Sequence, residues 1–199
     1  MERLEKQLAL LIELDKLKTV LRRTRIKSAQ DRLENSAEHS WHVALMALVL
    51  EEHANRPVDI ARVVKMLLLH DIVEIDAGDV LVYDQEAIKQ QQVKEYQAAD
   101  RLFGMLPDDQ GFELKHLWLE FEEAQSADAQ FAKALDRLIP MLLNYHNQGI
   151  GWIENNVTQQ QALSVNQKIE LGSVILWDKA KQMIDQATEN GWLNVNQGD

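Results

Sequence analysis

The dipeptide His70-Asp71 places an imidazole beside a carboxylate at the end of a strongly apolar segment, residues 63–69. Polar groups in such a place are costly to bury unless they have a partner. A divalent metal suits both groups, because imidazole nitrogen and carboxylate oxygen are common metal ligands. The dipeptide therefore predicts a metal centre whose other ligands come from elsewhere in the chain.

Histidines and a carboxylate in apolar surroundings supply the other candidates. The chain has six histidines and no cysteine, which excludes disulfides, thiolate sites and cysteine nucleophiles. His39 falls in the first turn of a predicted helix, and Asp136 falls within the apolar helical stretch 131–139, where a carboxylate needs an ionic partner. With His70 and Asp71 they would form a site on three helices for Mn²⁺, Co²⁺, Fe²⁺, Ni²⁺ or Mg²⁺.

Helices must position these side chains, because apolar residues recur at helical spacing through most of the sequence. Ser36, Asp59 and Ser126 are expected N-caps, and residues 164–167 read as a capping box that opens a last helix. The charged stretch 22–35 lacks this period and is expected to be a loop, and no segment shows convincing strand alternation. We therefore expect an all-α fold. The expected helices cover about 2–20, 36–53, 59–71, 84–102, 112–123, a segment from 126 that includes Asp136, and 164–187.

The bulk composition fits one soluble domain. With 199 residues, 46% of them hydrophobic, and few Gly or Pro, the chain suits a single helical domain over 1–199. Its core would cover about 36–147, with the N-terminal helix and the C-terminal helix packed on it. No segment approaches the ~20 apolar residues that span a bilayer, and no signal peptide is evident, so we expect a cytoplasmic protein without membrane partners.

The net charge of -11 disfavours binding to a nucleic acid polymer, because phosphate chains demand an excess of Lys and Arg. A small phosphorylated ligand remains possible, since a local cationic pocket is sufficient for it. Basic residues gather between Lys16 and Arg32 in this otherwise acidic chain.

Three short motifs carry a resemblance to a known family. They are Glu-Asn-Ser-Ala-Glu-His-Ser at 34–40, Leu-His-Asp-Ile-Val-Glu at 69–74 and Ala-Lys-Ala-Leu-Asp-Arg-Leu at 132–138. In this order they resemble the HD superfamily of metal-dependent phosphohydrolases, in the branch of the bacterial 5′-deoxynucleotidases and related predicted HD hydrolases. The resemblance implies a helical bundle with a central metal site, and hydrolysis of a small phosphorylated metabolite such as a nucleoside 5′-monophosphate.

The resemblance also implies roles for individual residues. His39, His70, Asp71 and Asp136 would bind one divalent metal, the pattern around 37–40 selecting His39 over His42. The resemblance further implies Glu74 and Asp79 as acidic catalytic residues (with Asp76 as a less favoured substitute for Asp79), Arg22 at the phosphate, and His42 in the pocket wall. Two more cations are expected near the substrate. Arg23 lies beside Arg22 in the basic stretch, and Lys133, three residues before Asp136, would project from the same side of its helix.

One departure from the family concerns the sugar. This chain has Arg23 where the deoxynucleotidases have a tryptophan that helps exclude ribose, so the preference for deoxyribose is open. Two other functions also stay open: a non-catalytic helical module that binds metal and nucleotide, and a di-iron oxygenase. The oxygenase needs additional histidine ligands between positions 71 and 136, where only His116 occurs. Members of the family commonly form homodimers, and the first helix and the tryptophan-rich C-terminal region offer apolar surface for one.

Overall fold

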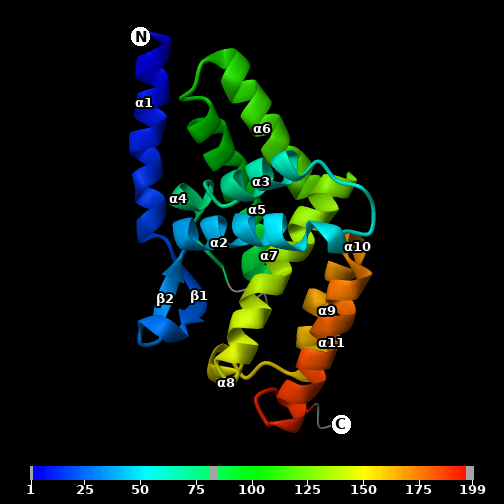
Figure 1. Ribbon diagram of the computed structural model, residues 1–199. Coiled ribbons are helices and arrows are strands. Elements are labelled where there is room, and N and C mark those ends of the chain that lie inside the picture. The colour runs from blue at the N-terminus through cyan, green and yellow to red at the C-terminus, as the bar shows by residue number, and fades with distance from the viewer. Residues whose placement is uncertain (1, 81–84, 196–199) are drawn as a thin grey trace.

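The computed structural model describes residues 2–80 and 85–195, and for residues 85–89 only the backbone (Figure 1). In chain order its elements are α1 (Arg3–Glu13), η1 (Leu14–Thr19), β1 (Leu21–Ile26), η2 (Lys27–Ala29), β2 (Arg32–Asn35), α2 (Ser36–Leu50), η3 (Glu51–His53), α3 (Ile60–Leu69), α4 (Glu74–Ala77), α5 (Gln85–Phe103), α6 (Asp108–Glu123), α7 (Ala127–His146), α8 (Ile150–Glu154), α9 (Gln159–Asn166), α10 (Ile169–Gly172) and α11 (Val174–Glu189). The expected all-α class is confirmed, apart from the small hairpin of β1 and β2.

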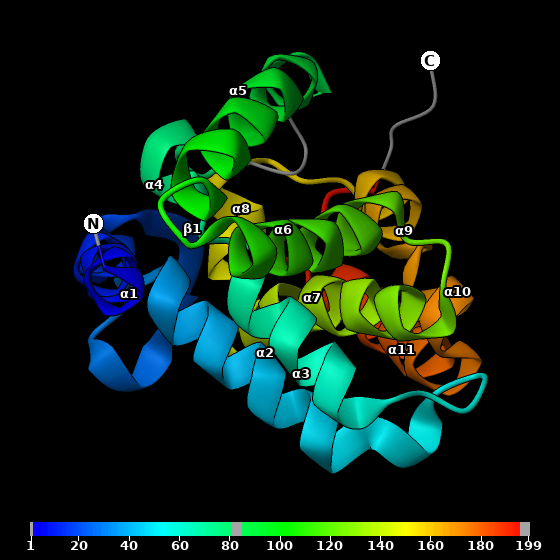
Figure 2. The same cartoon turned by 90° about the horizontal axis from the view of Figure 1, so that it is seen from above.

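Helix α7 is the central element of the bundle. It packs against α2, α3, α6, α10 and α11, and Figure 2 shows it enclosed by these helices. Phe131, Leu135, Leu138 and Ile139 recur at helical spacing and are buried. Asp136 follows directly after Leu135, and its side chain remains 17% exposed. The central helix therefore carries a carboxylate at the border of its apolar stripe.

A second apolar cluster supports the end of α3. It joins η1, α4, α5 and α6 around the buried Trp118. The indole Nε1 of Trp118 donates a hydrogen bond to the carbonyl oxygen of His70 at 3.1 Å, and the ring of Phe121 lies 5.0 Å from the imidazole of His70. These contacts fix the backbone and ring of the histidine that ends the helix.

The expectation of a loop over 22–35 is wrong, because β1 and β2 pair there as an antiparallel hairpin. Leu21 lies opposite Asn35 and Arg25 opposite Leu33. Gln30 and Asp31 form the turn with φ angles of 55° and 58°. The strands lack apolar alternation because the side chains that they bury are polar, Thr24 and Glu34 among them.

Some of the helix boundaries in the structure agree with those expected from the sequence. Asp59 and Ser126 cap α3 and α7 as expected. The N-cap of α2 is Asn35 rather than Ser36, and α2 ends at Leu50.

The predicted capping box at 164–167 and a single helix over 164–187 are wrong. Thr158 and Gln161 form a capping box that opens α9, and Ser173 caps α11. The chain breaks between them at Gly172, where a Cβ atom would clash with the carbonyl oxygen of Gln130 on α7. The close approach of α10 to α7 therefore interrupts the helix. None of the helices in the described ranges is long and apolar enough to cross a membrane.

Candidate metal centre and adjoining pocket

His39, His70 and Asp136 meet where α2, α3 and α7 come together. One ligand atom from each lies within 4.8 Å of the other two. His39 Nε2 is 3.0 Å from Asp136 Oδ1, and His70 Nε2 is 3.5 Å from the same oxygen. Two imidazoles and a carboxylate at this spacing can coordinate one divalent ion.

His70 is oriented for ligation by its own helix. Its Nδ1 lies 2.8 Å from the carbonyl oxygen of Leu67, which assigns the ring proton to Nδ1. Its Nε2 is buried and makes no well-directed hydrogen bond within the part of the chain that the structure describes. A buried ring nitrogen that faces Asp136 and Asp71 without a hydrogen-bond partner fits a metal ligand, as does a donor set without sulfur.

Asp71 joins the cluster at its edge and is shared with Arg22. Its Oδ1 lies 3.0 Å from His70 Nε2, and its Oδ2 accepts a hydrogen bond from Arg22 Nη1 at 2.6 Å. It is 3.8 Å from His39 Nε2 but is not part of the group whose ligand atoms all lie within 4.8 Å. The structure thus brings the four expected ligands together, with Asp71 also bound to an arginine.

The protonation of the centre is governed by its mixture of buried charges. Burial would lower the pKa of His70, but Asp71 and Asp136 outweigh it and raise that pKa to about 10. Burial would raise the pKa of Asp71, but His70 and Arg22 lower it to about 2. The pKa of Asp136 is likewise lowered against its burial, through His39 and His70. The carboxylates are therefore ionised and bind cationic partners.

Glu74 lies one helical turn after His70, on the short helix α4. Its Oε2 accepts a hydrogen bond from Ser36 Oγ at 2.5 Å, and its Oε1 is 3.6 Å from Arg22 Nη1. Burial raises the pKa of Glu74 to about 9, with a further contribution from Asp71 and an opposing one from Arg22. A carboxyl group whose pKa lies above neutrality can exchange a proton during a reaction.

The two other acidic candidates lie in different places. Asp79 lines the pocket, with Oδ1 3.9 Å from Arg22 Nη1, and burial raises its pKa. Asp76 makes two hydrogen bonds to the exposed Arg101, at 2.5 and 2.8 Å. Its carboxylate is thus engaged outside the site.

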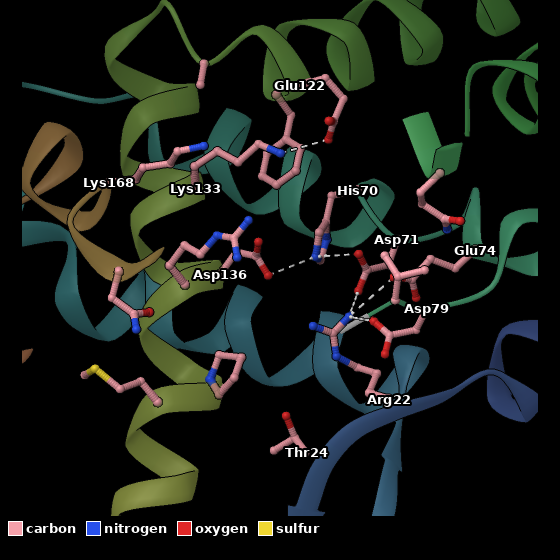
Figure 3. A pocket seen from close by; sticks show the side chains of 18 of the residues that line it. Arg22, Thr24, His70, Asp71, Glu74, Asp79, Glu122, Lys133, Asp136 and Lys168 are labelled. Atoms are coloured by element: carbon pink, nitrogen blue, oxygen red, sulfur yellow. Dashed lines mark hydrogen bonds and ion pairs between the residues drawn. The ribbon is translucent and has the colours of Figure 1, made fainter. Parts of the chain in front are cut away.

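A pocket of about 710 Å³ adjoins the cluster, and Figure 3 shows the side chains that face it. Arg22 projects into it from β1 and contacts Asp71, Glu74 and Asp79. Arg23 also lines the pocket but is exposed.

On the opposite wall, Lys133 and Lys168 extend from α7 and from the segment after α9 (Figure 3). Lys133 Nζ is bound to Glu122 at 2.9 Å and lies over the ring of Phe121, so its charge is already partly engaged.

The structure does not bring His42 to this group. Its ring lies 5.9 Å from that of Trp41, which is 64% exposed, and no contact with a site residue is found among the described residues. A step of three helical residues turns the side chain about 60° away from His39 and moves it along the helix. The expectation that His42 forms the pocket wall is therefore not supported by its position.

Several residues at the site carried no role in the sequence analysis. They include Glu34 and Ser36, both buried, and the pocket residues Glu95 and Lys168. Burial, with Glu122 nearby, raises the pKa of Glu95 to about 7. One signal could have identified Glu34 and Ser36: they flank Asn35, a residue type that favours N-caps, shortly before His39.

Comparison with known proteins agrees with this geometry. A family model described as HD domain matches residues 14–177. The crystal structure of a predicted metal-dependent phosphohydrolase from Magnetospirillum magnetotacticum MS-1 is similar with a TM-score of 0.91 and 46% identity, over 96% of this chain and 95% of that one. A conserved hypothetical protein from Pyrococcus furiosus, at 20% identity and a TM-score of 0.64, shares the fold.

The curated relatives carry a more specific name. The 5′-deoxynucleotidase HDDC2 of Bos taurus is 36% identical over 105 residues, which are 52% of this chain and 49% of that protein. The human protein of the same name is 33% identical over 107 residues. The chain spans about half the length of these two curated relatives. With the family model matching most of its length, the chain belongs to the HD domain family.

Proposed function

We propose that the protein is a metal-dependent phosphomonoesterase whose substrate is a nucleoside 5′-monophosphate. One observation carries this proposal: the cluster of His39, His70 and Asp136 opens onto the same pocket as the half-buried cation Arg22 and the acid Glu74. A bound divalent ion would activate a water and neutralise charge on the phosphoryl oxygens. The names of the relatives, 5′-deoxynucleotidase and metal-dependent phosphohydrolase, support the same reaction class.

The ligand set favours one divalent metal at this centre. His39, His70, Asp71 and Asp136 would hold it, and five buried or half-buried acids of the described residues gather around Arg22. Such an excess of buried negative charge is stabilised by a divalent cation. Mn²⁺, Co²⁺, Fe²⁺, Ni²⁺ and Mg²⁺ all accept these donors.

Different residues of this chain would bind the phosphate and transfer the protons. Arg22 binds the phosphoryl oxygens and stabilises the charge that develops on them. Glu74 would orient the attacking water and accept its proton, once a bound cation has lowered the raised pKa of this carboxyl. Asp79, which lines the same pocket, would assist the leaving group. Asp79 takes this role in preference to Asp76, because Asp76 is bound to Arg101.

The nucleoside would occupy the rest of the pocket. Its wall includes polar side chains that can hydrogen-bond a base or a sugar, namely Thr24, Gln92, Asn144, Asn155 and Asn166. Arg23 stands at the position of the deoxynucleotidase tryptophan, and it lies at the pocket without the bulk of an indole. We therefore propose that the enzyme accepts ribose as well as deoxyribose.

A homodimer is the proposed assembly. Leu4, Leu8, Leu11 and Ile12 leave an apolar face of α1 between 49% and 75% exposed. The C-terminal tryptophans contribute less surface than expected, since Trp152 and Trp177 are buried in the core. No nucleic acid polymer or membrane is proposed as a partner, and a cytoplasmic location stays a proposal.

A phosphate-release screen tests the function. Chelator-treated protein is supplied with Mn²⁺, Co²⁺ or Mg²⁺ and offered nucleoside mono-, di- and triphosphates in ribose and deoxyribose forms. We expect metal-dependent release from monophosphates. Nucleotide binding without turnover across the panel would support a non-catalytic module instead.

A count of two irons per chain would support the oxygenase. His116 gives that alternative no ligand, because it is exposed on α6 and stacks on Phe112 at 6.1 Å.

A further inference from the structure

Glu34 and Ser36 enclose the capping residue Asn35 at the junction of β2 and α2. Asn35 has extended backbone angles, φ −102° and ψ 160°, and its Oδ1 caps α2 by accepting a hydrogen bond from the backbone N–H of Glu38 at 3.0 Å. Side chains alternate in direction along extended backbone, so Glu34 and Ser36 share the side opposite Asn35. Both are buried, with 3% and 0% of their surface exposed, and both face the candidate site.

Glu34 lies between a metal ligand and the phosphate-binding arginine. Its Oε2 is 3.5 Å from His39 Nδ1 and 3.8 Å from Arg22 Nε. All three atoms are buried, and none has a hydrogen-bond partner in the part of the chain that the structure describes. Two N–H donors and one carboxylate oxygen are complementary, and a movement of about 0.5 Å brings the closer pair to hydrogen-bond distance.

Ser36 holds the acid on the other side of the site. Its hydroxyl donates to Glu74 Oε2 at 2.5 Å, which leaves Oε1 as the oxygen that faces Arg22. The backbone N–H of Ser36 donates to the carbonyl oxygen of Val20 at 3.0 Å. The serine is therefore fixed at both ends and restricts the rotation of the Glu74 carboxylate.

We propose that the Glu34-Asn35-Ser36 junction is a positioning element that aligns the metal centre, the phosphate-binding arginine and the acid at once. Glu34 accepts the Nδ1 proton of His39, so that Nε2 is the free ligand atom, and it restrains Arg22. Ser36 acts on one residue only, and it orients the carboxylate of Glu74. This inference rests on the proposed function for its catalytic consequences, but its structural part is measurable without turnover.

The Glu34 arm is tested with Glu34→Gln, which preserves shape and removes the charge. Direct Mn²⁺ binding, followed by electron paramagnetic resonance, should weaken by about 10–100-fold, because partners that orient metal ligands contribute on that scale. KM should rise as well, since Arg22 loses its restraint. The matched control is Glu154→Gln, which removes an exposed carboxylate that holds the same hairpin through Arg25 at 2.9 Å. Mn²⁺ affinity within twofold of wild type in Glu34→Gln would overturn this arm.

The Ser36 arm is tested with Ser36→Ala, and the control is Ser40→Ala. Ser40 is a buried serine one turn further along α2 whose hydroxyl has no hydrogen-bond partner among the described residues. Ser36→Ala should lower kcat by about tenfold with KM and Mn²⁺ affinity unchanged, which is typical of a lost orienting contact. Its crystal structure should show the Glu74 carboxylate rotated. An unmoved carboxylate, or an unchanged kcat, would overturn this arm.

The proposed function and the positioning element can be disproved separately. If the wild-type protein releases no phosphate from any ester, the proposed function is wrong, whereas weaker Mn²⁺ binding in Glu34→Gln and a rotated Glu74 in Ser36→Ala still support the positioning element. If wild type is active and both variants behave as their controls do, the function stands and the positioning element is wrong.

Discussion

Arg22 Nη1 lies 2.6 Å from Asp71 Oδ2, so the arginine at the centre of the site is bound to one of its expected metal ligands. The same guanidinium also approaches Glu74 and Asp79, at 3.6 and 3.9 Å. The expected metal ligand, the proposed catalytic acid and the proposed substrate-binding residue are therefore electrostatically coupled. A change at any one of them should alter both stability and catalysis.

Replacing Arg22 by Ala should affect both properties. The side chain is only 13% exposed, and removing one partner of a buried ion pair typically costs about 3–5 kcal/mol. Thermal unfolding of the metal-free protein should shift to lower temperature, and added Mn²⁺ should restore part of the loss. Phosphate release should fall by about 100-fold or more. Arg25→Ala, which removes the surface-facing arginine of the same strand, serves as the control and should retain activity.

Asp136→Asn should separate metal binding from folding. Asp136 Oδ1 is within 3.5 Å of both histidines, and an amide is a poor substitute for a carboxylate ligand. Metal content after dialysis against Mn²⁺ should drop to background, with the helical circular dichroism unchanged. Asp178→Asn, at an exposed position of α11, controls for the loss of one negative charge. Full metal content in Asp136→Asn would refute the ligand assignment.

Metal affinity should increase with pH. The pKa of His70 is raised to about 10, so the metal-free site holds a proton there at neutral pH, and the metal must displace it. The affinity for Mn²⁺ should therefore rise by up to about tenfold per pH unit between about pH 6 and pH 8 for each proton released. Calorimetry in buffers of different ionisation enthalpy counts the released protons. A Mn²⁺ affinity that does not change with pH would contradict the protonation of His70 in the metal-free site.

The raised pKa of His70 has the opposite effect on the stability of the metal-free protein. A histidine whose pKa is raised on folding stabilises the native state below its unfolded pKa, and this contribution is lost as pH rises towards about 10. Raising the pH should therefore lower the free energy of unfolding of the metal-free protein, while it increases the affinity for Mn²⁺.

The sugar preference should depend on position 23. Arg23 lies at the pocket where the resemblance places a tryptophan in the deoxynucleotidases. Wild type should hydrolyse a ribonucleoside 5′-monophosphate and its deoxy form with kcat/KM values within about tenfold of each other, since one hydroxyl without a dedicated contact contributes little discrimination. Arg23→Trp should shift the ratio towards the deoxy substrate. A strong deoxy preference in wild type would show that another residue excludes ribose.

Much of the candidate site could be predicted from sequence, because its expected ligands lie in or beside helices with a clear apolar period. His39, His70, Asp71 and Asp136 were all named, and the structure brings them together. The apolar stripe of α7 indicated that the carboxylate of Asp136 needs an ionic partner. The central helices and their caps at Asp59 and Ser126 followed from the same pattern.

The parts that could not be predicted depend on tertiary contacts between polar groups. The β1–β2 hairpin buries Thr24 and Glu34, so its sequence has no apolar alternation to detect. Ser36 was read as a cap because serine favours that position, whereas its hydroxyl binds Glu74 on a distant helix. The break at Gly172 reflects contact with Gln130, which local sequence does not encode.

A titration of chelator-treated protein with Mn²⁺, in the presence of a nucleoside 5′-monophosphate, tests the central claim most directly. Phosphate release should be absent without metal, rise with added Mn²⁺ and saturate when one ion is bound per chain. Release that is independent of metal, or bound Mn²⁺ with no release from any 5′-monophosphate, would contradict the account.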